Sequence, residues 1–240
     1  MPQIEGILNL TPDSFRESSR YDMDIFRNPK VDIVDIGAVS SRPGAAPVSE
    51  EQEWARLEPV LSHLPRGKRI SLDTTRSSIV RRAFGLIGDF IVNDISAGED
   101  DPQMLRTAAE LGLEYVAMHK RGTPATMDSL CRYENGIMNE LLAYFADFAH
   151  RAREAGLERW ILDPGLGFAK TPEQNMEILY NLKALRVFGR PILTGPSNKR
   201  FTKGREEEVL RLCLQSDIVR LHSDRIDFFT KANNRPTSYE

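Results

Sequence analysis

A set of carboxylate, amide and cationic residues stands at the ends of short apolar runs along this sequence. Its members are Asn9, Asp35, Asp73, Asn93, Asp94, His119, Asp163, Lys199, Arg220 and His222. The acids and amides suit a flat heterocycle, because a carboxylate accepts hydrogens from an amino-lactam edge and an amide both accepts and donates. Lys199, Arg220 and His222 instead offer positive charge and a planar fork for phosphate. The set therefore indicates a ligand with a nitrogen-rich ring at one end and phosphate at the other.

Some of these residues have an equally good structural interpretation. Asp35 comes one residue before the end of its apolar run, so it fits either the binding site or support of a neighbouring loop. His119 and Arg121 flank a loop and fit plain surface positions equally well. The sequence has no zinc-ligand spacing, nucleophile elbow or redox motif. The residue pattern therefore does not indicate zinc, nucleophile-elbow or redox chemistry.

The stretch WILDPGLGFAKT, residues 160–171, shows how such residues are positioned. Three apolar residues lead into Asp163, and Pro164 then stops the strand because it lacks an N–H. Gly165 and Gly167 allow a sharp turn and a close approach to a ligand, although an ordinary strand and turn would look similar. We expect Asp163 at the carboxyl end of a parallel strand, where α/β proteins bind ligands.

Strands and helices alternate along the whole chain. The expected strands are 4–10, 31–36, 70–72, 90–92, 115–118, 160–163, 191–193 and 218–221, and the helices 49–63, 77–86, 101–111, 134–155, 171–185, 205–215 and 224–232. Eight strands with helical crossovers predict one (β/α)₈ TIM barrel domain over residues 1–240. An open doubly wound sheet explains the polar strand ends less well. The first and seventh helices should be short, because residues 22–30 offer at most about two turns and the unit of residues 201–217 is also short.

Composition excludes several classes of protein. The chain has 240 residues, 40% hydrophobic and 28% charged, with a net charge of −3, which fits a globular domain and not a nucleic-acid surface. No apolar run is long enough to cross a bilayer, and the N-terminus lacks the basic region of a secretory signal. Cys131 and Cys213 have no metal-type spacing, so we expect reduced thiols in a cytoplasmic protein.

The motifs together resemble those of dihydropteroate synthases, the pterin-binding (β/α)₈ enzymes of folate synthesis. The resemblance runs in order over nearly the whole chain, in the stretches ILNLTPDSF (7–15), DIGAVSSRPGA (35–45), SLDTTRSSIV (71–80), IVNDISAG (91–98), AMHKRGTPATM (117–127), ILDPGLGFAKT (161–171), TGPSNKRF (194–201) and IVRLH (218–222). It implies a transferase that condenses 6-hydroxymethyl-7,8-dihydropterin pyrophosphate with p-aminobenzoate. The products would be 7,8-dihydropteroate and pyrophosphate, and the family is a sulfonamide target.

The resemblance also implies a role for each site residue. The pterin would be held by Asp73, Asn93, Met118, Asp163, Phe168, Lys199 and Arg220. Pyrophosphate would be bound by Asn9, Arg220 and His222. Mg²⁺ would be the cofactor, with Asn9 as a metal ligand. The p-aminobenzoate pocket would comprise Phe15, Ser41, Arg42, Pro43, Phe168 and Lys199. The implied catalytic residues are Asp73, Asp163, Lys199 and Arg220. The implied partners are small molecules, with neither nucleic acid nor membrane, and a homodimer is compatible with the resemblance.

The sequence departs from the family pattern in loops. The usual Gly-Gly-Glu-Ser-Thr-Arg-Pro is Gly-Ala-Val-Ser-Ser-Arg-Pro at residues 37–43, so the Glu is missing. Asn198 replaces an Arg, Ala169 replaces a common Gly, and residues 17–19 and 223–224 also differ. Two other interpretations therefore stay open. One is a pterin-binding protein without turnover, and the other is a methyltetrahydrofolate-binding methyltransferase domain.

Overall fold

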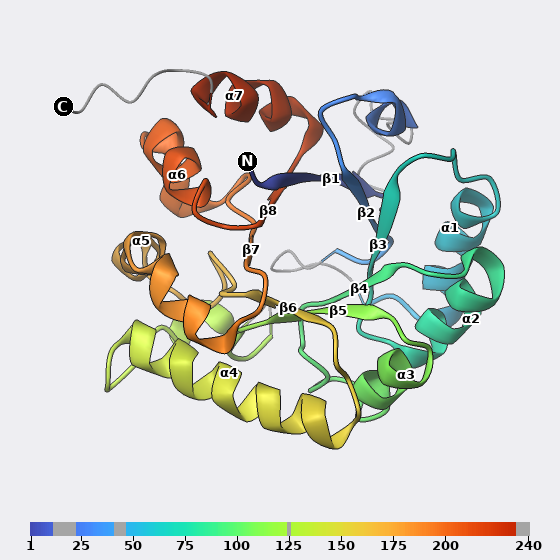
Figure 1. The fold of residues 1–240 in the computed structure, drawn as a ribbon, viewed down its shortest axis with the longest axis horizontal. Coiled ribbons are helices and arrows are strands. Elements are labelled where there is room, and N and C mark those ends of the chain that lie inside the picture. The colour runs from blue at the N-terminus through green and yellow to red at the C-terminus, as the bar shows by residue number, and fades with distance from the viewer. Residues whose placement is uncertain (12–22, 41–46, 124–125, 234–240) are drawn as a thin grey trace.

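The computed structural model describes residues 1–11, 23–40, 47–123 and 126–233 and contains one parallel β-barrel surrounded by helices (Figure 1). Its eight strands are hydrogen-bonded in the order β6-β5-β4-β3-β2-β1-β8-β7. Their bounds are β1 Gln3–Asn9, β2 Ile33–Gly37, β3 Arg69–Asp73, β4 Ile91–Asp94, β5 Glu114–Met118, β6 Trp160–Asp163, β7 Leu193–Thr194 and β8 Ile218–Leu221. The predicted (β/α)₈ barrel is confirmed.

The barrel closes between β6 and the short strand β7. A single parallel bridge joins Leu162 to Ile192 there, and the Leu162 N–H donates to the Pro191 carbonyl at 2.9 Å. The other neighbouring strands share continuous parallel registers, such as Glu5 opposite Ile33 in β1 and β2. Closure brings all the carboxyl ends to one mouth of the barrel.

The barrel interior is layered, because alternate residues of a strand point inward. Near the amino ends of the strands, an apolar cluster fills the barrel with Ile33, Ile91, Val116, Ile161, Leu193 and Ile218. Polar residues two positions further along these strands, such as Asp35 and Asn93, are buried above that cluster. The larger hydrophobic core lies between the strands and the surrounding helices.

The main helices are α1 Glu50–Leu61, α2 Ser77–Ile87, α3 Met104–Glu110, α4 Ile137–Glu154, α5 Pro172–Tyr180, α6 Glu206–Cys213 and α7 Ser223–Asn233. Helix α1 begins with a capping box, in which Ser49 Oγ accepts from the Gln52 N–H and the Ser49 N–H donates to Gln52 Oε1. Among the described residues, helices η2 Met23–Arg27, η3 Met127–Ser129, η4 Leu182–Phe188 and η5 Arg200–Thr202 are of the 3₁₀ type.

Three helix boundaries differ from the sequence predictions. Helix α3 begins at Met104 and not at Asp101, because the Asp101 carboxylate accepts from the Ser77 and Gln103 N–H groups and holds a turn. Helix α4 begins at Ile137 instead of 134, after Gly136 with φ +80°. The predicted helix 171–185 divides at Asn181 into α5 and η4.

The first and seventh crossovers are short, as predicted. Between residues 23 and 32, the described part of the first crossover, the only helix is the five-residue η2. Its Ile25 and Phe26 are 3% and 5% exposed and cover the flank of β1. In the seventh crossover α6 has eight residues, against 18 in α4.

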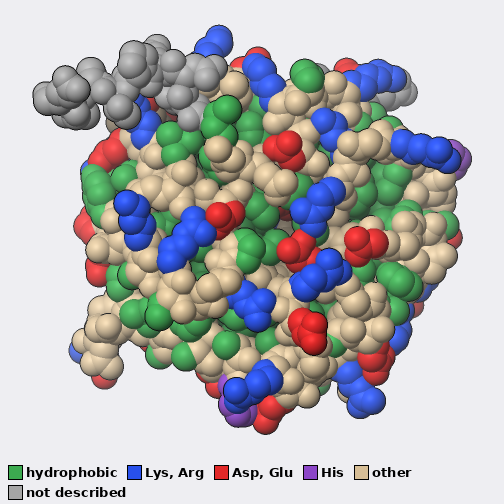
Figure 2. Space-filling model, in the orientation of Figure 1, with side chains coloured by type: hydrophobic (Ala, Val, Ile, Leu, Met, Phe, Trp, Pro, Cys, Tyr) green, Lys and Arg blue, Asp and Glu red, His purple; other side chains and the backbone are tan. Residues whose placement is uncertain are grey.

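The surface carries charges of both signs. Figure 2 shows Lys and Arg side chains interspersed with Asp and Glu over the face it presents, with no large single-sign patch among the described residues there. Within the described ranges, no helix is both long and apolar enough to cross a membrane.

Gly6→Ala should lower the free energy of unfolding, because a Cβ at Gly6 would lie 2.6 Å from Ile25 Cδ1. We expect a loss of about 1–3 kcal/mol by denaturant titration. Much of that loss should disappear in an Ile25→Val background, which lacks the clashing atom. As a control, Gly85→Ala in the exposed part of α2 meets nothing within 4 Å and should be neutral or stabilising. Additive effects of the two substitutions would contradict this account of the packing.

Candidate functional site

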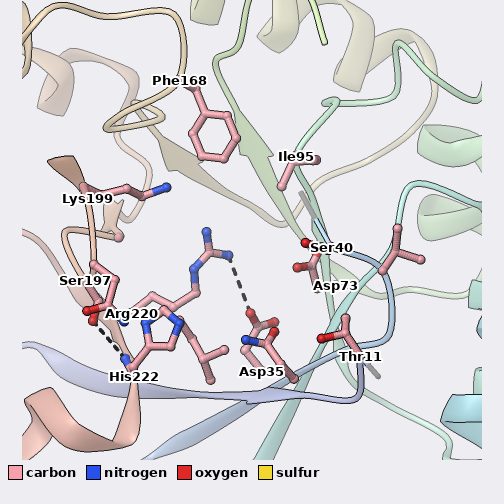
Figure 3. A pocket seen from close by; sticks show the side chains of 15 residues that line it. Thr11, Asp35, Ser40, Asp73, Ile95, Phe168, Ser197, Lys199, Arg220 and His222 are labelled. Carbon is pink, nitrogen blue, oxygen red and sulfur yellow. Dashed lines mark hydrogen bonds and ion pairs between the residues drawn. The ribbon is translucent and has the colours of Figure 1, made fainter. Parts of the chain in front are cut away.

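The carboxyl ends of the strands surround a cavity of about 280 Å³. Figure 3 shows it with Phe168 and Lys199 on one side, Asp73 and Ser40 on another, and Arg220 across the middle. Its lining residues are Ile7, Asn9, Thr11, Asp35, Val39, Ser40, Asp73, Ile95, Phe168, Gly195, Ser197, Asn198, Lys199, Arg220 and His222. The structure therefore brings predicted site residues together from distant parts of the sequence, namely Asn9, Asp73, Phe168, Lys199, Arg220 and His222.

Arg220 of β8 lies between two buried carboxylates. Its Nη1 is 3.6 Å from Asp35 Oδ2, and its Nη2 is 3.8 Å from Asp163 Oδ2. Burial opposes a charge on Arg220, but Asp35 and Asp163 outweigh it and raise the pKa of the guanidinium. Asp35, whose role the sequence left open, thus belongs to the site.

Asp35 also fixes the amide of Asn93. Asn93 Nδ2 donates to both Asp35 oxygens, at 3.2 and 3.1 Å. Asn93 Oδ1 is buried and has no hydrogen-bond partner among the described residues. The amide is therefore oriented with its oxygen available to accept a hydrogen from a ligand.

The floor of the site is closed in this structure. Asn93, Met118 and Asp163 are 0%, 1% and 2% exposed and lie below the open cavity, so they do not line it. Arg220 lies against Asp163, and Lys199 Nζ lies 4.2 Å from the centre of the Phe168 ring. A ring that reaches Asp163 must therefore displace these two cationic side chains.

Burial shifts the pKa values of the groups around the cavity. It raises the pKa of Asp73 to about 8, with help from the nearby Asp35. It lowers the pKa of Lys199 to about 8, and the positive charge of Arg220 adds to the effect. It raises the pKa of Asp163, against the stabilising effect of Arg220 and the Gly165 N–H. Groups poised in this way are typical of functional sites.

The rim at the ends of β1, β7 and β8 can hold an anion. Asn9, Thr11 and His222 line this side, and the His222 N–H donates to Ser197 Oγ at 3.1 Å. Asn198 takes φ +57°, a left-handed conformation that Asn tolerates better than the Arg of the family pattern would. The predicted grouping of Asn9, Arg220 and His222 in one cavity is present.

The glycine-rich loop after β6 needs its glycines. Gly165 has φ +67°, and a Cβ there would lie 2.0 Å from the His119 carbonyl oxygen. Its N–H donates to Asp163 Oδ1 at 2.8 Å. Ala169, where the family commonly has Gly, takes φ +49° and so carries some strain.

A buried lysine that the sequence analysis missed ties this loop to β5. Lys170 Nζ lies 2.9 Å from His119 Nδ1 and donates to the Phe168 and Gly165 carbonyls at 2.9 and 3.0 Å. Burial lowers the pKa of Lys170 to about 7. Because its partners are mostly main-chain carbonyls, no side-chain motif could have revealed this role.

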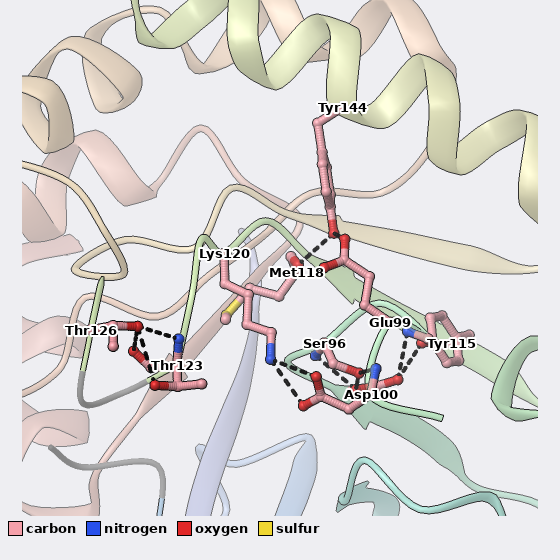
Figure 4. Close-up of polar contacts among 11 residues, drawn as sticks. Ser96, Glu99, Asp100, Tyr115, Met118, Lys120, Thr123, Thr126 and Tyr144 are labelled. Carbon is pink, nitrogen blue, oxygen red and sulfur yellow. Dashed lines mark hydrogen bonds and ion pairs between the residues drawn. The ribbon is translucent and has the colours of Figure 1, made fainter. Parts of the chain in front are cut away.

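Two candidates from the sequence prove to be structural. His119 is 1% exposed and packs edge-on to Tyr144, so it is neither a surface residue nor in the cavity. Asp94 is fully buried and accepts from Tyr115 Oη, Ser96 and the Gly98 N–H. Figure 4 shows the surrounding network, in which Tyr144 also donates to the Met118 carbonyl at 3.2 Å. These contacts support Met118 from behind.

Comparison with known proteins decides the family. Residues 5–216 match the family described as pterin binding enzyme. The chain belongs to this family. The dihydropteroate synthase of Synechocystis sp. is 39% identical over 82% of this chain and 72% of its own length. The folic acid synthesis protein fol1 of Pneumocystis carinii is 41% identical over 83% of this chain, which spans only 29% of that longer protein.

The fold agrees with solved structures of the same family. The dihydropteroate synthase of Anaplasma phagocytophilum with bound 6-hydroxymethylpterin-monophosphate has a TM-score of 0.84 and 29% identity, covering 97% of this chain and 98% of its own. Four residues predicted to line the p-aminobenzoate pocket, Phe15, Ser41, Arg42 and Pro43, lie outside the described residues.

Lys170→Met should weaken both the fold and pterin binding, because it leaves buried carbonyls of the glycine-rich loop without a donor. We expect a loss of about 1–3 kcal/mol in the free energy of unfolding and a higher Kd for the pterin, measured by calorimetry. Lys183→Met, at an exposed position in η4, is the matched control and should change neither. Unchanged affinity in Lys170→Met would show that the loop does not depend on this clamp.

Proposed function

We propose that this protein is a dihydropteroate synthase. It would join 6-hydroxymethyl-7,8-dihydropterin pyrophosphate to p-aminobenzoate and release pyrophosphate. The observation that carries the proposal is that one cavity, lined by Asn9, Arg220 and His222, lies over a floor of buried hydrogen-bonding groups, and Arg220 contacts Asp35 and Asp163 there. The family membership and the synthases among the relatives support it.

The floor of the cavity suits the pterin ring. Asp163 would accept hydrogens from the amino-pyrimidine edge, and Asn93 Oδ1, already oriented by Asp35, would accept another. Lys199 would donate to the ring oxo group, and Asp73 would face a further ring N–H. Met118 and Phe168 would pack on the ring, and Arg220 would lie over its face after leaving Asp163.

The rim suits pyrophosphate. Arg220 and His222 would donate to its oxygens, and Asn9 would hold a Mg²⁺ ion together with the phosphates. Among the described residues no group of three or more His, Cys, Asp or Glu could hold a metal. The amide oxygen of Asn9 with substrate phosphates suits Mg²⁺, which keeps several waters and uses few protein ligands plus substrate phosphates. The ion would stabilise negative charge on pyrophosphate.

The reaction needs charge stabilisation and no nucleophilic side chain. The bond between the pterin methylene carbon and the bridging oxygen breaks, and its electron pair leaves with pyrophosphate. Asp163 and the ionised form of Asp73 would stabilise the positive charge that develops on the electron-rich ring. That positive charge would in turn favour the ionised form of Asp73, whose pKa burial raises to about 8. The p-aminobenzoate nitrogen then attacks the carbon and loses a proton. Arg220 and His222 would stabilise the departing anion.

The p-aminobenzoate pocket would lie at the mouth of the cavity. Phe168 and Lys199, which are in contact, form its described part. Phe15, Ser41, Arg42 and Pro43 would complete it from the first two loops. A homodimer and a cytoplasmic location also stay predictions.

Turnover tests this function directly. Purified protein with both substrates and Mg²⁺ should form 7,8-dihydropteroate. Pterin binding without product would instead indicate a binding protein that has lost turnover. Binding of methyltetrahydrofolate in preference to the pterin pyrophosphate would indicate the methyltransferase-type function.

Asp163→Asn should nearly abolish pterin binding, because the swap places a donor where the pterin presents hydrogens. A loss on the order of 2–4 kcal/mol is expected by calorimetry. Asp89→Asn, at an exposed surface acid, is the control and should bind normally. Full affinity in Asp163→Asn would remove this residue from the pterin site.

Pyrophosphate with Mg²⁺ should raise the affinity for p-aminobenzoate. The residues that would bind the anion lie at strand ends, whereas the sequence predicts loops around Phe15 and residues 41–43, which we expect to close over bound charge. A coupling of about 1–3 kcal/mol is typical of linked sites. Titrations of p-aminobenzoate with and without pyrophosphate and Mg²⁺ measure it. Equal affinities would show that the second pocket is already formed.

A further inference from the structure

An acid that the proposed mechanism does not use lies inside the barrel. Glu5 of β1 stands opposite Arg220 of β8 in the parallel register, and opposite Ile33 of β2. Its neighbour Gly6 faces outward, because a Cβ there would contact Ile25 in η2. Alternate residues of a strand point to opposite faces, so Glu5 points inward. It is 1% exposed.

Charged and polar groups face Glu5 from the strands around it. They are Asp35 of β2, Ser71 of β3, Asp163 of β6 and Arg220 of β8. Glu5 Oε1 and Ser71 Oγ are buried and have no hydrogen-bond partner among the described residues. The layer that includes Ile33 is apolar, so it offers Glu5 no compensation for a charge.

The single guanidinium of Arg220 cannot neutralise the charges of Glu5 and of both neighbouring aspartates equally well. Arg220 already contacts Asp35 and Asp163, and an ionised Glu5 would add a third carboxylate in a poorly solvated place. Burial, and after it the charge of Asp35, raise the pKa of the Glu5 carboxyl to about 8, although Arg220 acts in the opposite direction. Near neutral pH Glu5 therefore holds a proton, and Arg220 stays shared between Asp35 and Asp163.

We propose that Glu5 is a positioning residue for the pterin site, whose neutral form leaves Arg220 available to the ligand and whose ionised form draws Arg220 away from it. The inference rests on the proposed function, because the ligand that Arg220 receives is the pterin pyrophosphate. Ionised Glu5 attracts Arg220 toward the barrel interior. Lifting Arg220 off Asp163 onto the pterin and its pyrophosphate then costs more. Ligand affinity should fall as Glu5 loses its proton.

The test is the pH dependence of ligand affinity in Glu5→Gln, which keeps the shape of neutral Glu5 and cannot ionise. We would measure Kd for 6-hydroxymethyl-7,8-dihydropterin pyrophosphate with Mg²⁺ from pH 6 to pH 9. The ratio of wild-type to variant Kd should be near one below pH 7 and reach on the order of fivefold at pH 9, the lower end of typical couplings. Titration of the ligand itself cancels in this ratio.

A second readout does not need the pterin. The pKa of Glu5 is raised from 4.5 to about 8, so the neutral form stabilises the fold below pH 4.5 and this contribution is lost as pH rises to about 8. The Tm of Glu5→Gln relative to wild type should therefore increase over that range. We expect an increase of a few degrees in a domain of this size. Glu114→Gln, which removes an acid paired with Arg69 at the start of β5, is the matched control and should give flat ratios.

Each outcome decides the proposal. A Kd ratio that does not change with pH, in a protein that binds the pterin, overturns it even if the Tm difference grows, because Glu5 is then only a buried acid. A pH-dependent ratio that Glu114→Gln reproduces overturns it as well. Failure of the wild-type protein to bind the pterin at any pH rejects the proposed function and this inference together.

Discussion

The contact of Arg220 with two buried carboxylates is the constraint on which the site depends. A guanidinium in the middle of a barrel is stable only if anions lie close to it, and Asp35 and Asp163 supply them from strands on different sides of the barrel. Asp35 and Arg220 also determine the orientation or the pKa of neighbouring groups. Asp35 orients the Asn93 amide, and Arg220 limits the rise in the pKa of Asp163. Removing any member would leave a buried charge or polar group uncompensated.

A ligand at the site would replace contacts that its side chains make with one another. Arg220 covers Asp163, and Lys199 lies on the Phe168 ring. A ring entering between them would exchange these interactions for its own hydrogen bonds and stacking, so the net change is smaller than the sum of new contacts. The floor beneath does not need to rearrange, because Asp94, Tyr115 and Tyr144 hold its supporting loop by side-chain hydrogen bonds.

The main chain of the glycine-rich loop after β6 determines the position of the side chains at the edge of the floor. Gly165 approaches the His119 carbonyl more closely than any residue with a Cβ could. Lys170 then donates to the carbonyls of Gly165 and Phe168, which positions the Phe168 ring over the cavity. Burial lowers the pKa of Lys170 to about 7, so its ammonium group loses a proton more readily than an exposed lysine does. Its role is to join carbonyls that would otherwise lack donors.

The sequence by itself determined the barrel, the strand ends and the residue types of the site. Apolar runs alternate with helical periodicity along the chain, and this pattern is visible in the local sequence. The Pro-Gly pair that follows Asp163 and ends its strand is visible in the same way. Helix boundaries at α3, α4 and α5 were less well predicted, because the Asp101 carboxylate and Gly136 act through geometry that composition does not show. Only the tertiary structure decided that Asp35 belongs to the site, that His119 and Asp94 support it, and that Glu5 and Lys170 are buried beside it. The physical reason is that burial and charge pairing depend on strands brought together by barrel closure, whereas local pattern records only which residues are available.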